Sequence, residues 1–460
     1  MNRPQIFNTD DTIVALATPA GVGAIGVLRL SGPKAIELAN QICRSKDLSI
    51  QASHTVHFGI VEADGRKIDE AVFTLFRAPA SFTREDVVEI SLHGSSFILD
   101  QVIQLLISLG ARLAQPGEFT FRAFLNGRFD LSQAEAVADL ISADNEHAHR
   151  VAFNQMRGGF SQEIGRLRTQ LVDFASLLEL ELDFSEEDVE FANRRQLKEL
   201  LLRIIQVVSG LQESFRLGNV IKNGVATVIA GRPNAGKSTL LNAILNEEKA
   251  IVSHIPGTTR DVIEDVLSIG GVKFRFYDTA GIREAEDMIE SIGVERTFEK
   301  MGQAAIILYL FDLTQTTPDQ LRTELDTMAK HNAELILVAN KLDEVKSLDG
   351  MEAYRQLGDV LFISAKKKEG LDVLVNKLLS LVEAGKIQNE SIVANARHFE
   401  ALGKSNAALQ SAIHAMDAEL PTDLVAQEIR QALHYLGEIT GEVSTDDLLG
   451  NIFSKFCIGK

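Results

Sequence analysis

The stretch Gly231-Arg-Pro-Asn-Ala-Gly-Lys-Ser-Thr239 carries the residue types that bind a nucleoside phosphate. An apolar, β-branched run precedes it and an apolar helical pattern follows it, which is the context that the phosphate-loop pattern G-x-x-x-x-G-K-[ST] requires. Gly231 and Gly236 let backbone N–H groups converge on phosphate oxygens, and Lys237 adds a positive charge. An ordinary glycine-rich turn is the alternative interpretation, and the flanking elements argue against it. Phosphate and Mg²⁺ contacts are therefore expected from Asn234, Ala235, Gly236, Lys237, Ser238 and Thr239, with the hydroxyl of Ser238 as a Mg²⁺ ligand.

A second motif, Asp278-Thr-Ala-Gly281, ends the apolar strand that follows this loop. In this position Asp278 can hold Mg²⁺ through water, and Gly281 can place its N–H on a γ-phosphate oxygen. Residues 251–261 lie between the two motifs, where we expect a switch segment whose threonine hydroxyls reach Mg²⁺ only when the γ-phosphate is present. Either segment alone is an ordinary turn, so the assignment depends on the phosphate loop. The contacts predicted here are those of Ser253, His254, Ile255, Pro256, Gly257, Thr258, Thr259, Asp278, Thr279, Ala280 and Gly281, with Thr259 as a Mg²⁺ ligand.

A third motif, N-K-x-D at residues 340–343, ends another buried strand and predicts which base is bound. A carboxylate there accepts hydrogen bonds from both N1–H and N2–H₂ of guanine. Adenine offers no such donor pair, so the motif argues against an ATPase. Ser364-Ala365-Lys366 follows the next apolar run as a companion loop at the base. The order and spacing of these motifs resemble those of the translation-factor-related GTPases and predict base contacts from Asn340, Lys341, Asp343, Ser364, Ala365 and Lys366.

One position departs from the Ras pattern. Ile282 follows Gly281, where Ras-like enzymes have a glutamine that orients the attacking water. An isoleucine cannot orient water, so hydrolysis needs another polar residue and another source of positive charge.

The composition limits which classes of protein this chain can belong to. The chain has 460 residues, of which 24% are charged and 45% hydrophobic, and we expect two to four folded domains. A net charge of −18 argues against a surface that coats nucleic acid broadly, although a local basic patch or a basic partner is compatible with it. The only cysteines are Cys43 and Cys457, so no disulfide framework is expected. Because we find neither a signal peptide nor an apolar run long enough to span a bilayer, we expect a cytoplasmic protein with no membrane partner.

Hydrophobic periodicity divides the chain into four segments. Residues 1–120 predict a small α/β domain with a hairpin at Asp64-Gly65. Residues 121–217 and 386–460 have helical spacing, while residues 218–385 alternate buried strands with amphipathic helices, as in a doubly wound α/β domain. The predicted fold class is α/β plus all-α, with the nucleotide domain inserted into a helical domain whose halves lie on either side of it.

Two local details of the helical segments are also predicted. Ser132 with Glu135 has the pattern of a capping box that opens a helix at residue 134. Gly437 and Gly441 are expected to break the helical pattern near the C-terminus.

The C-terminal segment, residues 441–460, ends in C-I-G-K. Together with G-R-P-N-A-G-K-S, G-T-T-R-D and the N-terminal segment, it closely resembles the MnmE (TrmE) family of tRNA-modification GTPases. The resemblance covers essentially the whole chain, including residues 17–21, 117–126 and 437–441. A plain switch GTPase would not need this flanking architecture.

The resemblance implies that the N-terminal domain dimerises and binds a one-carbon folate such as 5-formyltetrahydrofolate. Its folate contacts match Arg29, Glu89 and Arg128, with Lys460 approaching the same site. A charged side chain in an apolar strand most often faces solvent. It is the resemblance, and not the periodicity, that places Arg29 and Glu89 in a pocket.

The resemblance also implies a substitute for the missing glutamine. Proteins of this family use a K⁺ ion where G domains meet face to face, and its oxygen ligands match Asn234, Ser253, Ile255 and Thr258. Glu290 matches the family's water-positioning glutamate, although by its sequence alone it is an unremarkable acid on a helix surface.

The function that follows is a K⁺-activated GTP hydrolase that helps to add a carboxymethylaminomethyl group at C5 of the wobble uridine of tRNA. Its implied partner is an FAD-containing protein of the MnmG (GidA) type, in a heterotetramer with a homodimer of this chain. The alternative is a switch GTPase for ribosome assembly or signalling, without direct tRNA modification. Cys457 is either a catalytic nucleophile, if nearby Lys460 favours a thiolate, or a small buried hydrophobe, whereas Cys43 is expected in the core.

Overall fold

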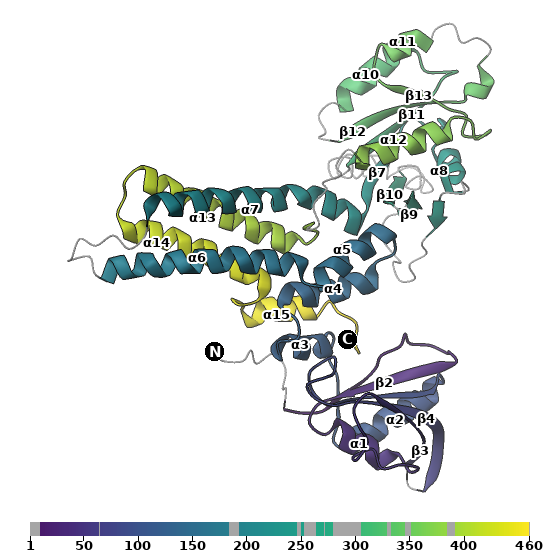
Figure 1. Cartoon of the computed structure of the whole chain (residues 1–460). Coiled ribbons are helices and arrows are strands. Elements are labelled where there is room, and N and C mark those ends of the chain that lie inside the picture. Colours follow the sequence, from purple (N-terminus) through teal and green to yellow (C-terminus); the bar gives the residue numbers. More distant parts are fainter. Residues whose placement is uncertain are drawn as a thin grey trace, which may run out of the picture. The chain divides into compact units, whose positions relative to one another are not determined.

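The computed structural model describes residues 10–63, 65–183, 193–245, 250–252, 264–270, 272–278, 305–328, 333–345, 351–383 and 392–459. The chain divides into two compact units (Figure 1). Unit 1 comprises Met1–Ser142, Ala152–Ser209 and Glu400–Lys460, and unit 2 comprises Ala143–Val151 and Gly210–Phe399. The four-segment division expected from the sequence stays a prediction.

Unit 1 contains a six-stranded sheet in the order β3-β4-β5-β2-β1-β6. Its strands are β1 Ile13–Leu16, β2 Ile25–Ser31, β3 Thr55–Ala63, β4 Arg66–Phe76, β5 Val87–His93 and β6 Arg112–Leu113. Alternate side chains of these strands share one core with helices α1 (Ala35–Ile42) and α2 (Ser96–Ser108), because strand side chains point to opposite faces in turn. Cys43 is buried in that core, as expected. The predicted hairpin is confirmed by the antiparallel pairing of β3 with β4, while Asp64 lies outside the described residues.

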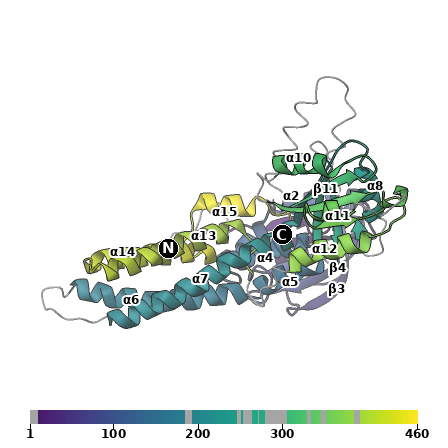
Figure 2. The same cartoon turned by 90° about the horizontal axis from the view of Figure 1, so that it is seen from above.

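Helices make up the remainder of unit 1, and those that contain residues 146–151, 210–223 and 396–399 continue into unit 2. They are α3 Glu118–Leu125, α4 Leu131–Ser142, α5 Glu146–Met156, α6 Gly159–Asp183, α7 Arg194–Asn223, α13 Ala396–Asp417, α14 Thr422–Thr440 and α15 Asp446–Phe453. Figures 1 and 2 both show α6 lying beside α14, so segments more than 200 residues apart in the sequence pack together. Each amphipathic helix buries its apolar stripe only through such a partner.

Two local predictions were wrong. Helix α4 begins at Leu131, and its capping box is formed by Asp130, whose Oδ1 accepts from Gln133 N, while Gln133 Oε1 accepts from Asp130 N. Ser132 is fully buried inside the helix and bonds Ser161 instead, so its hydroxyl is not available as a cap.

Gly437 does not break a helix either. Helix α14 runs through it to Thr440 and ends at Gly441, which adopts the left-handed conformation typical of a C-terminal cap. A Cβ at Gly437 would lie 3.0 Å from the Val443 side chain and 3.5 Å from Arg168 Nε. Close packing at this position, and not a break in the helix, therefore explains the glycine.

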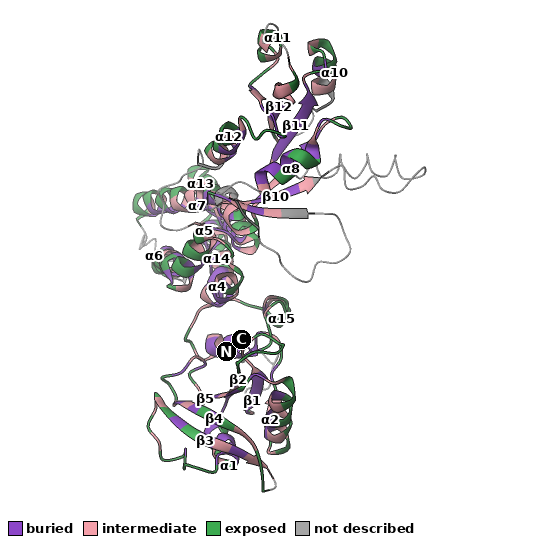
Figure 3. Cartoon of the chain, turned by 90° about the vertical axis from the view of Figure 1, so that its right-hand side faces the viewer, coloured by how far each residue is buried: buried purple, intermediate pink, exposed green. Residues whose placement is uncertain are grey.

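Unit 2 is built on a seven-stranded sheet in the order β13-β12-β11-β7-β10-β9-β8. Its strands are β7 Val225–Ala230, β8 Ala250–Val252, β9 Glu264–Ile269, β10 Val272–Asp278, β11 Ile306–Asp312, β12 Glu334–Asn340 and β13 Val360–Phe362. Strands β7, β10, β11, β12 and β13 are parallel, and all seven residues of β11 are buried (Figure 3).

Helices cover both faces of this sheet. They are α8 Lys237–Leu245, α10 Pro318–Met328, α11 Met351–Arg355 and α12 Leu371–Glu383. Side chains of α8 and α12 share one core, whereas Leu321 of α10 and Tyr354 of α11 belong to the other. The predicted doubly wound α/β domain is confirmed, and such sheets bind ligands beyond the carboxyl ends of their strands.

No helix in the described part of the chain is long and apolar enough to cross a membrane.

Candidate functional site

The phosphate loop leaves β7 at its carboxyl end and enters α8. Gly231 has φ +145°, and a Cβ there would lie 2.0 Å from the carbonyl oxygen of Leu310. Gly236 has φ +98°, and its Cβ would lie 2.3 Å from Asn340 Nδ2. Side chains at these two positions would collide with the neighbouring strand β11 and with the base-site asparagine, so both positions need glycine.

Lys237 holds its charge inside the loop. Its residue is only 8% exposed, and Nζ donates to the carbonyl oxygens of Gly231 at 2.8 Å and Arg232 at 3.0 Å. Both acceptors are neutral, so a phosphate oxygen would be a stronger partner for the ammonium. The side chains of Ser238 and Thr239 are exposed at the start of α8 and can reach a metal ion or a phosphate.

Asn340 ties the phosphate loop to the base loop. At the end of β12, its Nδ2 donates to the carbonyl oxygen of Ala235 at 2.8 Å, and its Oδ1 accepts from Ala365 N at 3.0 Å. Three segments that are far apart in the sequence are thereby joined by one buried amide. Because both ends of the amide are used, an aspartate here would leave the Ala235 carbonyl without a donor.

The side chain of Asp343 is held by the loop that follows β13. Its Oδ1 accepts from Ser364 Oγ at 2.7 Å, and this hydrogen bond is the main reason that the pKa of Asp343 lies below its ordinary value. The carboxylate is therefore ionised and can accept two N–H groups of a guanine. Burial opposes ionisation at Asp312, but the hydrogen bonds from Lys341 Nζ, at 2.7 Å, and from Thr314 outweigh it and lower the pKa of Asp312.

Part of the nucleotide site lies outside the described residues. The backbone of β10 places Asp278 at the carboxyl end of the strand beside β7. Outside the described residues lie Ser253, His254, Ile255, Pro256, Gly257, Thr258, Thr259, Thr279, Ala280, Gly281, Ile282, Glu290 and Lys460. Their roles stay predictions.

Unit 1 holds a second group of predicted residues. Arg29 of β2 and Glu89 of β5 are direct cross-strand partners, and Arg29 Nη2 and Nε lie 2.8 and 2.9 Å from Glu89 Oε1. Their side chains are 22% and 29% exposed, so the pair is neither buried nor freely solvated. The Arg29 Cζ lies 5.8 Å from the ring centroids of both Phe82 and Phe119. The pair thus forms a polar patch on the sheet that is flanked by aromatic rings.

Arg128 lies near the same aromatic ring, Phe82, as Arg29 does. Its Cζ is 5.4 Å from the Phe82 ring centroid and 5.3 Å from that of Phe129, and its Nη1 donates to the Ser81 carbonyl oxygen. Phe82 therefore contacts the cations of both Arg29 and Arg128. Nothing in the sequence distinguished Phe82 and Phe129, because a phenylalanine in a loop has no periodicity that separates it from a core residue.

The C-terminal tail reaches this group. Gly117 N donates to the Cys457 carbonyl oxygen at 3.4 Å, and Arg29 Nη1 donates to the Gly459 carbonyl oxygen at 3.3 Å. Gly459 has φ +92°, and a Cβ there would lie 2.3 Å from the carbonyl oxygen of Leu16, so only glycine allows this approach. The side chain of Cys457 is exposed, and its catalytic role stays a prediction.

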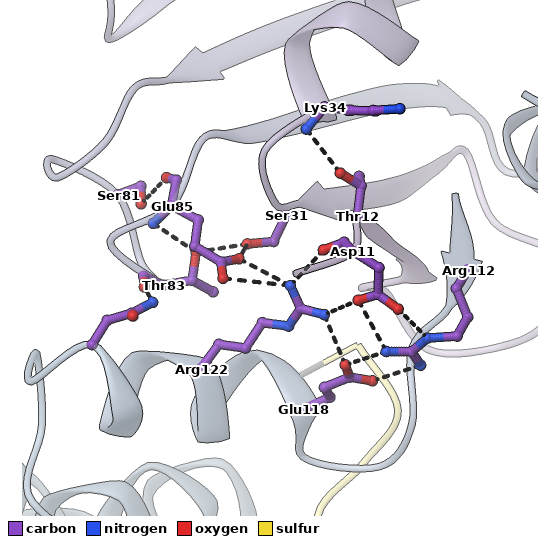
Figure 4. A network of polar contacts seen from close by, with 11 residues as sticks. Asp11, Thr12, Ser31, Lys34, Ser81, Thr83, Glu85, Arg112, Glu118 and Arg122 are labelled. Atoms are coloured by element: carbon purple, nitrogen blue, oxygen red, sulfur yellow. Dashed lines mark hydrogen bonds and ion pairs between the residues drawn. The ribbon is translucent and has the colours of Figure 1, made fainter. Parts of the chain in front are cut away.

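A network of charges fixes the loop that carries Phe82 (Figure 4). Arg122 of α3 is fully buried, and its Nη2 lies 2.6 Å from Asp11 Oδ1 and 3.0 Å from Glu118 Oε1. Arg112 bridges the same two carboxylates, and Arg122 Nη1 also reaches Glu85 at 3.4 Å. Burial opposes the ionisation of Asp11, but the hydrogen bonds from both guanidinium groups outweigh it and lower its pKa. Ion pairs between these opposite charges therefore join the loop at Glu85, strand β6 at Arg112 and helix α3.

Comparison with known proteins identifies two family models in the chain. Residues 131–457 match the MnmE helical domain, and residues 12–128 match the N-terminus of the GTP-binding protein TrmE. A tRNA modification GTPase MnmE from Cytophaga hutchinsonii is 56% identical over 461 residues, which cover 100% of both chains. Relatives of the same name from Flavobacterium psychrophilum and Bacteroides thetaiotaomicron are 52% and 50% identical, each over 98% of this chain and 99% of the relative.

Proposed function

The chain belongs to the MnmE family of tRNA modification GTPases, and from this premise we propose a K⁺-dependent, folate-linked mechanism for it. GTP hydrolysis in tRNA modification is the activity of the family. Our proposal is that the modification is the addition of a carboxymethylaminomethyl group at C5 of the wobble uridine. The cytoplasm, where tRNA is modified, is the expected compartment.

One observation carries this proposal beyond a simple GTPase cycle. A second polar site, Arg29 with Glu89, lies between aromatic rings, and the C-terminal tail reaches it through Gly459. A carboxylate beside a guanidinium can accept N–H groups of a heterocycle, and the partly exposed ring of Phe82 can stack on it. These features support a one-carbon folate such as 5-formyltetrahydrofolate as the ligand. A switch GTPase has no use for such a site.

The described residues also suit the proposed ions. The Ser238 hydroxyl would hold Mg²⁺, which neutralises charge on the β- and γ-phosphates. For K⁺, the exposed amide of Asn234 offers an oxygen ligand that no protein group in the described residues occupies. A monovalent cation there would supply the positive charge that an arginine supplies in other GTPases.

The proposed partners are a second copy of this chain, an FAD-containing protein of the MnmG type in a heterotetramer, and tRNA. Strand β3 is an edge strand, and its outward-facing Val56 and Phe58 are 64% and 60% exposed. An exposed apolar patch on a sheet edge supports a homodimer, whose mass can be measured by light scattering.

Deletion of the gene is expected to remove the C5 substituent from wobble uridines, because no other step would then supply it. Mass spectrometry of nucleosides from total tRNA measures this loss, and a plasmid copy should restore the modified nucleoside. Unchanged wobble uridines would instead support the switch GTPase that is our second candidate.

The folate site gives a prediction that does not involve GTP. We expect 5-formyltetrahydrofolate to bind the purified chain and the Arg29→Ala variant to bind it about tenfold more weakly, since a charged hydrogen bond is lost. Isothermal titration calorimetry measures both affinities, and the GTPase rate at saturating GTP serves as a control for folding. Equal affinities in the two proteins would remove Arg29 from the site.

A further inference from the structure

Two guanidinium groups lie between the same two segments of unit 1. Arg84 belongs to the loop 81–86, and its Nη1 donates to the Asn126 carbonyl oxygen at 2.9 Å. Arg128 belongs to the turn that follows α3, and it donates in the opposite direction to the Ser81 carbonyl oxygen. The two cations are thus brought together by contacts with backbone atoms.

No carboxylate neutralises them among the described residues. The acidic neighbours of Arg84 in the loop are used elsewhere: Glu85 bonds Arg122 and the Ser31 hydroxyl, and Asp86 accepts from Ala78 N. Burial lowers the pKa of Arg128, and the positive charge of Arg84 lowers it further. Two like charges held close together without a counterion predict that an anion binds there.

The backbone conformation of the loop also supports an anion-binding site. Arg84 has φ +59°, a left-handed conformation that residues with a Cβ seldom adopt. Such strained residues persist where the surrounding contacts fix them, and they are enriched at ligand sites. In this conformation the Arg84 side chain donates to the Asn126 carbonyl oxygen.

The pair lies next to the Arg29–Glu89 site. Phe82 contacts Arg128 on one side and Arg29 on the other, at 5.4 and 5.8 Å from its ring centroid. The Arg29–Glu89 pair therefore offers a carboxylate that accepts N–H groups, while the neighbouring Arg84 and Arg128 offer only cations. A ligand that fits has N–H donors at one end and carboxylates at the other.

We propose that Arg84 and Arg128 bind the carboxylates of the glutamyl tail of a folate whose pterin lies at Arg29 and Glu89. This inference rests on the proposed folate function of that site. Each added glutamate brings another negative charge, so polyglutamylated folate is the preferred form.

Calorimetry with 5-formyltetrahydrofolate carrying one or three glutamates tests the proposal on the full-length chain. The wild type should bind the triglutamate about tenfold more tightly than the monoglutamate. Arg84→Gln should bring that ratio close to one. Arg29→Ala should weaken both ligands equally and keep the ratio.

Arg77→Gln is the matched control, because the Arg77 guanidinium also donates to backbone carbonyls, but to those of Ser49 and Gln51 and not to those of Ser81 or Asn126. It should keep the wild-type ratio. Arg84→Gly relieves the left-handed strain and should fold even if Arg84→Gln does not, and it too should lose the preference.

Different results would overturn the folate proposal and the proposal for the arginine pair. If the wild type gives no heat with either ligand, both are overturned. If it binds the two ligands equally, or if Arg84→Gln keeps the ratio, only the role of this arginine pair is overturned. If Arg84→Gln keeps the ratio but weakens tRNA in a filter-binding assay, the anion is an RNA phosphate and not a folate carboxylate.

Discussion

Replacing Asp343 by asparagine is expected to lower the affinity for GTP on the order of 10²-fold and to create a preference for xanthosine triphosphate. The Asp343 carboxylate, which the Ser364 hydroxyl holds at 2.7 Å, can accept both N1–H and N2–H₂ of guanine. An asparagine presents one acceptor and one donor, and its amide N–H₂ opposes the N2–H₂ of guanine. Xanthine has an oxygen at that position and restores the pair. Competition with a fluorescent guanine nucleotide measures both affinities.

The control for this prediction is Ser364→Ala. It removes the hydroxyl that holds Asp343 but keeps the carboxylate, so GTP should bind only modestly more weakly and xanthosine triphosphate should gain nothing. If Asp343→Asn binds GTP as tightly as the wild type, the base is recognised elsewhere.

Exchange of K⁺ for Na⁺ should slow GTP hydrolysis by about 10²-fold at constant ionic strength, the size of effect seen when one stabilising group is removed from a transition state. Na⁺ is smaller than K⁺ and does not suit the same set of oxygen ligands. Phosphate release at saturating GTP and Mg²⁺ measures the rates. Equal rates in the two salts would refute the K⁺ proposal while leaving the GTPase intact.

Variants of Asn234 connect that effect to the phosphate loop. Asn234 has φ +62°, which glycine and aspartate tolerate better than alanine does. Asn234→Gly removes the side-chain oxygen without adding strain and should abolish the difference between K⁺ and Na⁺. Asn234→Asp keeps an oxygen ligand and should retain the difference. If Asn234→Gly still responds to K⁺, this side chain does not hold the ion.

The sequence by itself determined the nucleotide site and the fold of its domain. The phosphate loop, N-K-x-D and S-A-K are local patterns, and each follows a buried strand whose apolar run predicts its place in the sheet. The carboxyl ends of parallel strands meet at one edge, so a local reading of each motif was enough to predict that they lie together. The bond from Asn340 to Ala235 across 105 residues confirms that they do.

Only the tertiary structure decided which charged side chains of the N-terminal domain contact one another. Periodicity alone favoured solvated side chains for Arg29 and Glu89, yet sheet register pairs them across 60 residues, and Gly459 reaches Arg29 from the other end of the chain. The capping box was misplaced for a similar reason, since Ser132 is buried against Ser161 of another helix. A local pattern specifies the backbone conformation of a segment. Which charges meet, and which aromatic ring lies between them, depends on how distant segments pack, and no short stretch of sequence contains that information.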